Sequence, residues 1–251
     1  GYIGAGSLYR LLPRRVSRDL PRPLRSSASV ECRSLVDLAA ILDPEVHIAI
    51  WRRPSNERVL DLLQRPDCGF ERPSRFVGRA ADLDRERDLA DFVPASARAA
   101  DPAGAADLVA DVASLCEIFT ELVCADELMV SLESPDEATC PRFHVDRVGI
   151  RMLVTYLGAG TELLPHEHVD RRWLGDAGHG RADHETGLML PGSEVQQVSP
   201  FDVVLLKGEA WPGAESFGAV HRSPDPSGQR RVLLRVDMLS QAPLETAEVS
   251  G

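Results

Sequence analysis

A histidine and an aspartate stand two residues apart in the stretch Phe-His-Val-Asp, as His144 and Asp146. Side chains at positions i and i+2 of a β-strand point to the same face, so this imidazole and this carboxylate can reach one point. A second imidazole from a distant strand would complete a two-histidine, one-carboxylate set. Such a set holds Fe(II) on one face and leaves coordination positions open. The alternative is an ordinary polar turn before a strand, since the pair alone is a weak signal.

Three further features favour the metal site. The apolar segment 150–157 follows directly and could line the interior of a β-fold. His221 comes just after a strand, a glycine and a loop. Arg231 stands ten residues later, on the same strand face as Arg235, where a guanidinium can grip a carboxylate with two parallel hydrogen bonds. Alternatively, His221 could donate to a backbone carbonyl instead of binding a metal, and Arg231 could form an ion pair at the surface.

With these residues in this order, the sequence resembles the Fe(II)/2-oxoglutarate-dependent oxygenases. The resemblance implies a hydroxylating enzyme that consumes oxygen and decarboxylates 2-oxoglutarate. The implied iron ligands are His144, Asp146 and His221. The implied 2-oxoglutarate-binding residues are Arg231, with Arg235 in reserve, and Thr155 or Tyr156.

A second resemblance covers residues 46–239. It is carried by the stretches HIAIWRRP, CPRFHVDRVGIRMLVTYLGAG, VHRSP and RRVLLRVDM, which are similar to a bacterial family known as domain of unknown function 1826. That family implies no established activity, so the expected function still rests on the metal-site motif.

Four further histidines lie close together in the sequence, at His166, His168, His179 and His184. Gly160, five residues and then His-x-His match the first half of the cupin motif. However, Arg172 and Trp173 stand where that motif expects a glutamate. The segment is polar and lacks apolar periodicity, so we expect a solvated loop. The alternatives are an active-site lid and an accessory zinc site.

Beyond residue 127, short apolar segments alternate with Gly and Pro, which is typical of a β-sandwich or barrel. Seven strands are expected, in 127–134, 150–157, 186–192, 194–200, 201–208, 218–224 and 230–239. Before that point we expect a strand at 46–51, and helices at 34–42, at 55–65 with Ser55 as N-cap, and at 104–123. Residues 67–104 are expected to be loop or short helix.

The predicted fold class is therefore α+β, a double-stranded β-helix (jelly roll) with a helical N-terminal layer. We expect a single domain over 31–251, with a mainly helical part at 31–126 and the jelly-roll core at 127–240. Residues 1–30 are rich in arginine and are expected to be a disordered or extended tail, a transit peptide being the alternative.

Composition narrows the partners and the compartment. The net charge of −11 disfavours non-specific nucleic-acid binding, which needs basic patches, and no apolar stretch is long enough for a membrane span. The five cysteines form no C-x-x-C pair, so we expect a protein of the reducing cytoplasm rather than a disulfide framework. The substrate, a small molecule or a protein, is not identified by the sequence.

Two other function classes remain beside the Fe(II)/2-oxoglutarate-dependent oxygenase. The fold could be a cupin-like protein that handles or senses zinc without turnover. It could also be a jelly roll that serves only for protein contacts and binds no metal. Arg231 separates the first two, since a storage or sensing site has no need for a carboxylate-binding arginine.

Overall fold

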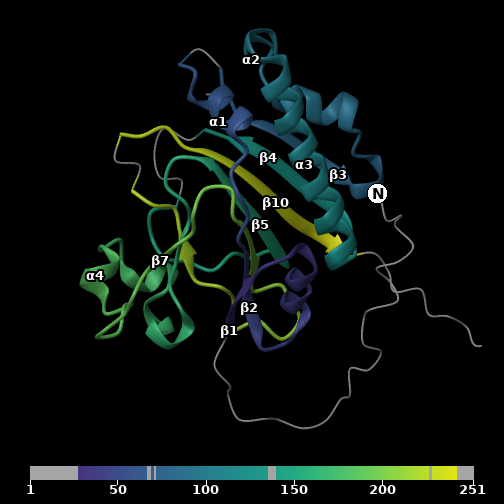
Figure 1. Ribbon diagram of the computed structural model, residues 1–251. Coiled ribbons are helices and arrows are strands. Elements are labelled where there is room, and N and C mark those ends of the chain that lie inside the picture. The colour runs from purple at the N-terminus through teal and green to yellow at the C-terminus, as the bar shows by residue number, and fades with distance from the viewer. Residues whose placement is uncertain (1–27, 67–68, 71, 135–139, 226–227, 242–251) are drawn as a thin grey trace, which may run out of the picture.

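The computed structural model describes residues 28–66, 69–70, 72–134, 140–225 and 228–241. Most strands belong to one large mixed sheet, and a small sheet accompanies it (Figure 1). The large sheet has the order β1-β2-β8-β5-β10-β4-β3, and the small one has the order β7-β6-β9. The strands are β1 (Ala28–Cys32), β2 (Val46–Trp51), β3 (Ser74–Arg79), β4 (Ala125–Glu133), β5 (Ile150–Leu157), β6 (Glu162–Leu163), β7 (Gln196–Gln197), β8 (Val203–Lys207), β9 (His221–Arg222) and β10 (Val232–Gln241).

Among the described residues, four α-helices and several 3₁₀ or π-helical segments connect these strands. The helices are α1 (Glu57–Gln64), α2 (Ala95–Ala100), α3 (Pro102–Val123) and α4 (Asp183–Thr186). The 3₁₀ segments are η2 (Leu35–Leu42), η3 (Ala80–Asp82), η5 (Ala90–Phe92), η6 (His166–His168), η7 (Arg171–Trp173) and η8 (Gly175–Gly178), and η4 (Arg85–Leu89) is a π-helical segment. No helix among the described residues combines the length and the apolar character needed to cross a membrane.

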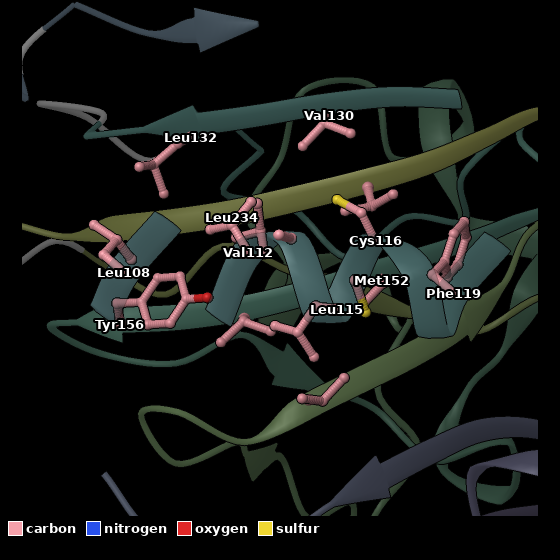
Figure 2. Close-up of a cluster of buried hydrophobic side chains, with 14 of the residues drawn as sticks. Leu108, Val112, Leu115, Cys116, Phe119, Val130, Leu132, Met152, Tyr156 and Leu234 are labelled. Atoms are coloured by element: carbon pink, nitrogen blue, oxygen red, sulfur yellow. The ribbon is translucent and has the colours of Figure 1, made fainter. Parts of the chain in front are cut away.

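Helix α3 shows why the sequence folds as predicted in this region. Asp101 caps it by accepting a hydrogen bond from the Gly104 amide, Pro102 stands in the first turn, and Cys124 ends it in the left-handed conformation. Its apolar residues recur every three or four positions and are buried against the large sheet, as Figure 2 shows for Leu108, Val112, Leu115, Cys116 and Phe119. The predicted helix at 104–123 is confirmed.

The two faces of the large sheet bury different apolar clusters because side chains alternate along each strand. In β5, Met152 and Val154 join the cluster under α1 and α3, whereas Leu153 joins a second cluster. That second cluster also contains Leu163 of β6 and Ala219, next to β9, so it lies between the large and small sheets. Polar residues of β5 and β10 whose side chains lie on the same face of the sheet as Leu153 therefore face the space between the sheets.

Several sequence-based expectations need correction. A strand within 186–192 is wrong, because α4 ends at Thr186 and only Met189 forms an isolated bridge, to Val169. The N-cap of α1 is Asn56 rather than Ser55, since the Asn56 side chain accepts from the amides of residues 58 and 59. Strand β3 occupies part of the region expected to be loop or short helix.

The start of the chain also differs from expectation. Residues 28–30, expected to belong to the tail, are in β1, which pairs in parallel with β2. The rest of the predicted tail, 1–27, lies outside the described residues. Strands β2 and β3 and the last two residues of β1 come from the part expected to be mainly helical, and all three strands join the same large sheet as the C-terminal strands.

Candidate metal centre

The sheet topology brings His144, Asp146 and His221 together at one edge of the small sheet. His144 and His221 form an isolated antiparallel bridge in which each backbone amide donates to the other's carbonyl at 3.0 Å. The two imidazole rings lie 4.5 Å apart, centroid to centroid. One ligand atom from each of the three residues fits within 4.8 Å of the others, and no other such group of three exists among the described residues.

Both histidines present the nitrogen that a metal would need. Nδ1 of His144 lies 2.9 Å from the Arg142 carbonyl, and Nδ1 of His221 lies 3.2 Å from the Ala219 carbonyl. A carbonyl can only accept, so each Nδ1 carries its proton and each neutral ring has its lone pair on Nε2. This backbone contact is the one that fixes ring orientation in metal-ligating histidines.

The carboxylate of Asp146 faces both lone pairs. Its Oδ1 lies 3.6 Å from Nε2 of His144, and its Oδ2 lies 3.1 Å from Nε2 of His221. Oδ2 is buried and has no hydrogen bond of suitable geometry from the described residues. A buried carboxylate oxygen facing an imidazole lone pair is stable only with a proton or a metal cation between them. The donor set therefore fits a divalent metal.

Without a metal, a proton takes that place. Burial disfavours a charged His144, but its hydrogen bonds with Asp146 and Cys140 outweigh burial and raise the pKa of His144 to about 10. For Asp146, burial is again opposed, here by the facing imidazoles of His144 and His221 and by the charge of Arg151. The pKa of Asp146 therefore falls well below its ordinary value.

Arg151, which the sequence-based reasoning missed, binds one of the two Asp146 carboxylate oxygens and leaves the other without a hydrogen bond from the described residues. Its Nη1 donates to Oδ1 of Asp146 at 2.6 Å, and its Nε and Nη2 donate to the two oxygens of Asp237 at 2.5 and 2.9 Å. Asp237 stands directly opposite Arg151 on β10. The sequence could have indicated Arg151 by its position. It is the second residue of the strand that follows His-x-Asp, and its side chain lies on the same face of that strand as Leu153.

A close backbone approach holds the Asp146 segment in place. The Gly208 amide donates to the Gly149 carbonyl and the Glu209 amide to the Asp146 carbonyl, both at 2.8 Å. A Cβ on Gly208 would lie 2.1 Å from the Val148 carbonyl oxygen, so only glycine fits there.

Arg231 lies in the space between the sheets, away from any carboxylate hydrogen-bond partner. It is 6% exposed, and its Nη2 donates to the hydroxyls of Thr155 at 3.2 Å and Thr161 at 3.0 Å. Its Nε is buried without a partner, and it forms no ion pair with the described residues. Burial, only weakly offset by the charge of Glu133, lowers the pKa of Arg231 to about 10. Among the described residues, this guanidinium has no counter-ion within ion-pair distance.

The other predicted cosubstrate residues occupy different surroundings. The hydroxyls of Thr155 and of Thr161, which was not among the predicted residues, both accept from Arg231. Arg235 already donates to Glu133 at 2.8 Å, so its charge is paired. Tyr156 points to the opposite face of β5, into the cluster beside α3 (Figure 2), where its hydroxyl donates to Asp111 at 2.6 Å. Placing Tyr156 beside the cosubstrate is corrected by this geometry.

The structure does not assemble the four histidines of the second group. His166 accepts from Arg171, and His168 accepts from the Glu194 amide at 3.0 Å. His179 and His184 are exposed at the surface. An accessory zinc site built from these four residues is therefore not formed. The segment is also less solvated than expected, since Leu164, Val169 and Leu188 pack with Phe143 in a third apolar cluster.

Comparison with known proteins gives one family match and several distant structural likenesses. The model of a family described as "Protein of unknown function (DUF1826)" matches residues 32–237. No curated protein gives a significant sequence match.

Three solved structures illustrate the distance of the likenesses. A dioxygenase for auxin oxidation from rice has 14% identity and a TM-score of 0.42, over 84% of this chain and 82% of that one. Dioxygenase for auxin oxidation 1 from Arabidopsis thaliana, in a binary complex with 2-oxoglutarate, has 12% identity and a TM-score of 0.43, over 87% and 93%. A prolyl-4-hydroxylase from Pseudomonas putida has 13% identity and a TM-score of 0.36, over 82% and 100%. Likenesses at these TM-scores carry no argument about activity, so the functional argument rests on the site.

Proposed function

The chain belongs to the DUF1826 family, and from that premise we propose that it is a mononuclear Fe(II)/2-oxoglutarate-dependent oxygenase. Its iron ligands would be His144, Asp146 and His221. Two imidazoles and one carboxylate suit Fe(II) and leave positions for further ligands. When bound, Fe(II) with 2-oxoglutarate and oxygen would supply the oxidising chemistry that hydroxylates a C–H bond of the substrate.

The observation that carries this proposal is the unpaired, buried Arg231. A buried guanidinium without a carboxylate is costly, and it is tolerated where a ligand supplies the missing charge. The distal carboxylate of 2-oxoglutarate would accept from Arg231, which Thr155 and Thr161 hold in place. A site that only stores or senses a metal has no use for this arrangement.

The rest of the chain would position these groups and keep water out. Arg151 would hold Asp146 through Oδ1 and leave Oδ2 directed at the metal. Leu153 and Leu206 belong to the apolar cluster between the sheets and would exclude water from the space between Asp146 and Arg231. We propose that the large and small sheets together form a jelly roll, with α1 and α3 packed outside it.

The same proposal extends to compartment and partners. A reducing cytoplasm would keep the metal as Fe(II) and the thiols reduced. The described cysteines, Cys32, Cys116, Cys124 and Cys140, are all free. No nucleic-acid or membrane partner is proposed.

Zinc handling is the second candidate function, and one observation favours it. Histidine and aspartate are also zinc ligands, and the three donors meet within 4.8 Å. The state of Arg231 separates the candidates, because a zinc-handling protein should tolerate its removal.

The test is an anaerobic titration of metal-free protein with Fe(II) and then 2-oxoglutarate, followed by visible absorption. We expect a metal-to-ligand charge-transfer band in the wild type. Arg231→Met should need at least roughly tenfold more 2-oxoglutarate for half-maximal absorption, since a charge-assisted hydrogen bond is lost. Arg230→Met is the matched control, because Arg230 donates to the Arg65 carbonyl instead. Tight zinc binding with no band in the wild type would exclude the oxygenase and support zinc handling.

A further inference from the structure

Basic side chains gather at the end of the large sheet nearest the metal centre. Arg171 donates through Nε to Nδ1 of His166 at 3.2 Å and through Nη2 to the Gly218 carbonyl at 2.8 Å. The ring of Phe217 lies 5.2 Å from that of His166 and 6.3 Å from that of His47. We call Arg171, His166 and His47 the basic cluster.

The basic cluster has no carboxylate partner among the described residues. Arg171 forms no ion pair there, and Glu209 acts on it only at longer range. Burial lowers the pKa of Arg171 and of His166, and burial with the charges of Lys207 and Arg171 lowers the pKa of His47 to about 4. Burial and neighbouring positive charge thus disfavour the charged form of each histidine, so Arg171 carries the positive charge of the cluster near pH 7, and it has no counter-ion within ion-pair distance among the described residues.

A buried polar atom without a partner is a second, independent observation. His47 is 4% exposed, and its Nδ1 has no hydrogen-bond partner among the residues that the structure describes. Buried ring nitrogens in native proteins are satisfied by protein, water or ligand. The ring also donates to the Phe217 backbone and is neutral near pH 7, so Nδ1 carries the lone pair and is satisfied by a ligand group that donates a hydrogen bond, such as a hydroxyl.

The donors of the basic cluster can be assigned. The Nε–H of an arginine can only donate, so Nδ1 of His166 accepts and its Nε2 carries the proton. None of the described residues accepts from Nη1 of Arg171. The cluster therefore offers Nη1 of Arg171 and Nε2 of His166 to an acceptor, which suits an oxyanion.

The basic cluster lies at the metal end of the fold, away from Arg231. Leu206 pairs with both Arg151 and Ile48, so His47, one residue before Ile48, lies at the end of the sheet where Arg151 meets Asp146. Thr155, which contacts Arg231, lies at the other end of β5. The Gly218 carbonyl held by Arg171 is only three residues from the ligand His221.

We infer that the basic cluster binds an anionic group, a carboxylate or a phosphate, of the primary substrate. The inference rests on the proposed oxygenase function. The substrate would be an acid distinct from 2-oxoglutarate, anchored at the metal end while 2-oxoglutarate occupies the Arg231 end. A neutral substrate would leave the cluster without its counter-ion.

Calorimetric titration of the full chain, loaded with Co(II) and 2-oxoglutarate, tests the site with inorganic phosphate and with acetate. We expect one of the two to bind, and the tighter one identifies the anion class. Arg171→Gln should weaken its binding roughly tenfold, the loss expected for a charge-assisted hydrogen bond. Arg172→Gln is the matched control, because that exposed neighbour pairs with Asp170 and should bind as the wild type does. Absence of binding by both anions, or equal binding by Arg171→Gln, overturns the inference.

Relaxation of the phosphate ³¹P signal tests the location. Co(II) in the metal site should broaden the signal of bound phosphate, Zn(II) should not, and Arg171→Gln should remove the broadening. Broadening that survives in Arg171→Gln shows direct coordination to the metal and contradicts the inference. Arg171→Lys keeps the charge, so retained binding there guards against a folding defect in the glutamine variant.

The outcomes separate this inference from the proposed function. His144→Ala should abolish metal binding and yet retain phosphate or acetate binding at the basic cluster. If the 2-oxoglutarate band forms and no anion binds, the proposed oxygenase function is supported and the inference of an acidic substrate is contradicted. If anions bind and no band forms, the anion site is supported and the proposed oxygenase function is contradicted.

Discussion

At the residue scale, the centre depends on how Asp146 shares its two oxygens. Arg151 occupies Oδ1, so Oδ2 remains for a cation beside His221. The same guanidinium is itself held by Asp237 on the neighbouring strand. A fixed carboxylate loses little freedom on binding a metal, which is why partners behind a metal ligand affect its affinity.

Arg151→Gln should therefore weaken metal binding by roughly 10- to 100-fold, the range typical of such partners. The affinity for Co(II) can be measured by competition with a chromophoric chelator. Arg235→Gln is the control, since Arg235 pairs with Glu133 at the far end of the same ion network. Equal losses in the two variants would show that Arg151 has no particular role at Asp146.

Thr155 and Tyr156 are neighbours whose side chains point to opposite faces of β5, and they should respond differently. Thr155→Val removes an acceptor from Arg231 and should weaken 2-oxoglutarate binding several-fold. Tyr156→Phe should leave that affinity unchanged and lower the free energy of unfolding by about 1 kcal/mol, because a buried hydrogen bond to Asp111 is lost. Band titrations and chemical denaturation measure the two effects, and a shift of 2-oxoglutarate affinity in Tyr156→Phe would contradict this assignment.

At the element scale, the segment between β6 and β7 positions both histidines of the candidate metal site. Helix α4 contributes Asp183, whose Oδ2 accepts at 3.0 Å from the Phe143 amide and from Nη1 of Arg222. Phe143 precedes His144 and Arg222 follows His221. One buried carboxylate thus joins the chain segments that carry the two imidazoles, and the segment is a structural part of the site.

Asp183→Asn should weaken Co(II) binding, since the neutral amide holds Arg222 less strongly than the carboxylate does. Loss of the buried charge also leaves Arg222 with Glu162 alone, so the melting temperature should fall. His184→Asn is the control on the same helix, because His184 is exposed. Unchanged metal affinity in Asp183→Asn would show that Asp183 does not position the two histidines.

At the scale of the whole molecule, one sheet carries two charged sites at its opposite ends. The metal centre and the basic cluster lie near the start of β5, and Arg231 lies near its end. Apolar residues of the cluster between the sheets, such as Leu153 and Leu206, lie between the two ends. This separation allows one anion at each end, with the metal ligands at the first.

Lys207, at the end of β8, links global stability to pH. It is 1% exposed, its Nζ donates to the Asp43 carbonyl at 2.6 Å, and burial lowers its pKa to about 8. Between about pH 8 and 10.5 the unfolded chain holds this proton and the folded chain does not. The free energy of unfolding should therefore rise with pH in that interval, by up to roughly 3 kcal/mol relative to Lys207→Met.

Chemical denaturation of both proteins from pH 7 to pH 10 measures this difference. Lys207 is the sole lysine in the sequence, so no other lysine titrates in the comparison. Parallel stability curves would show that Lys207 keeps its ordinary pKa in the folded protein.

Local patterns predicted the elements that have strong periodicity or long apolar runs. Helix α3 and strands β4, β5, β8 and β10 were predictable because their own side chains bury against the core. Strand β3 was not, because it is an edge strand with two arginines and alternating partial exposure. Strand β1 was hidden in an arginine-rich segment and exists through parallel pairing with β2.

The sequence by itself determined the candidate ligands, because His-x-Asp places two side chains on one face of an extended chain whatever its neighbours are. It also determined that Arg231 and Arg235 share a face, through the same period of two. Only the tertiary structure decided that, in the described part of the chain, Arg235 has a counter-ion and Arg231 has none, and that Arg151 holds Asp146. The tertiary structure also showed that His166, His168, His179 and His184 do not come together in one site. These facts depend on which strands pair and in which register, and register is set by contacts between segments far apart in the chain.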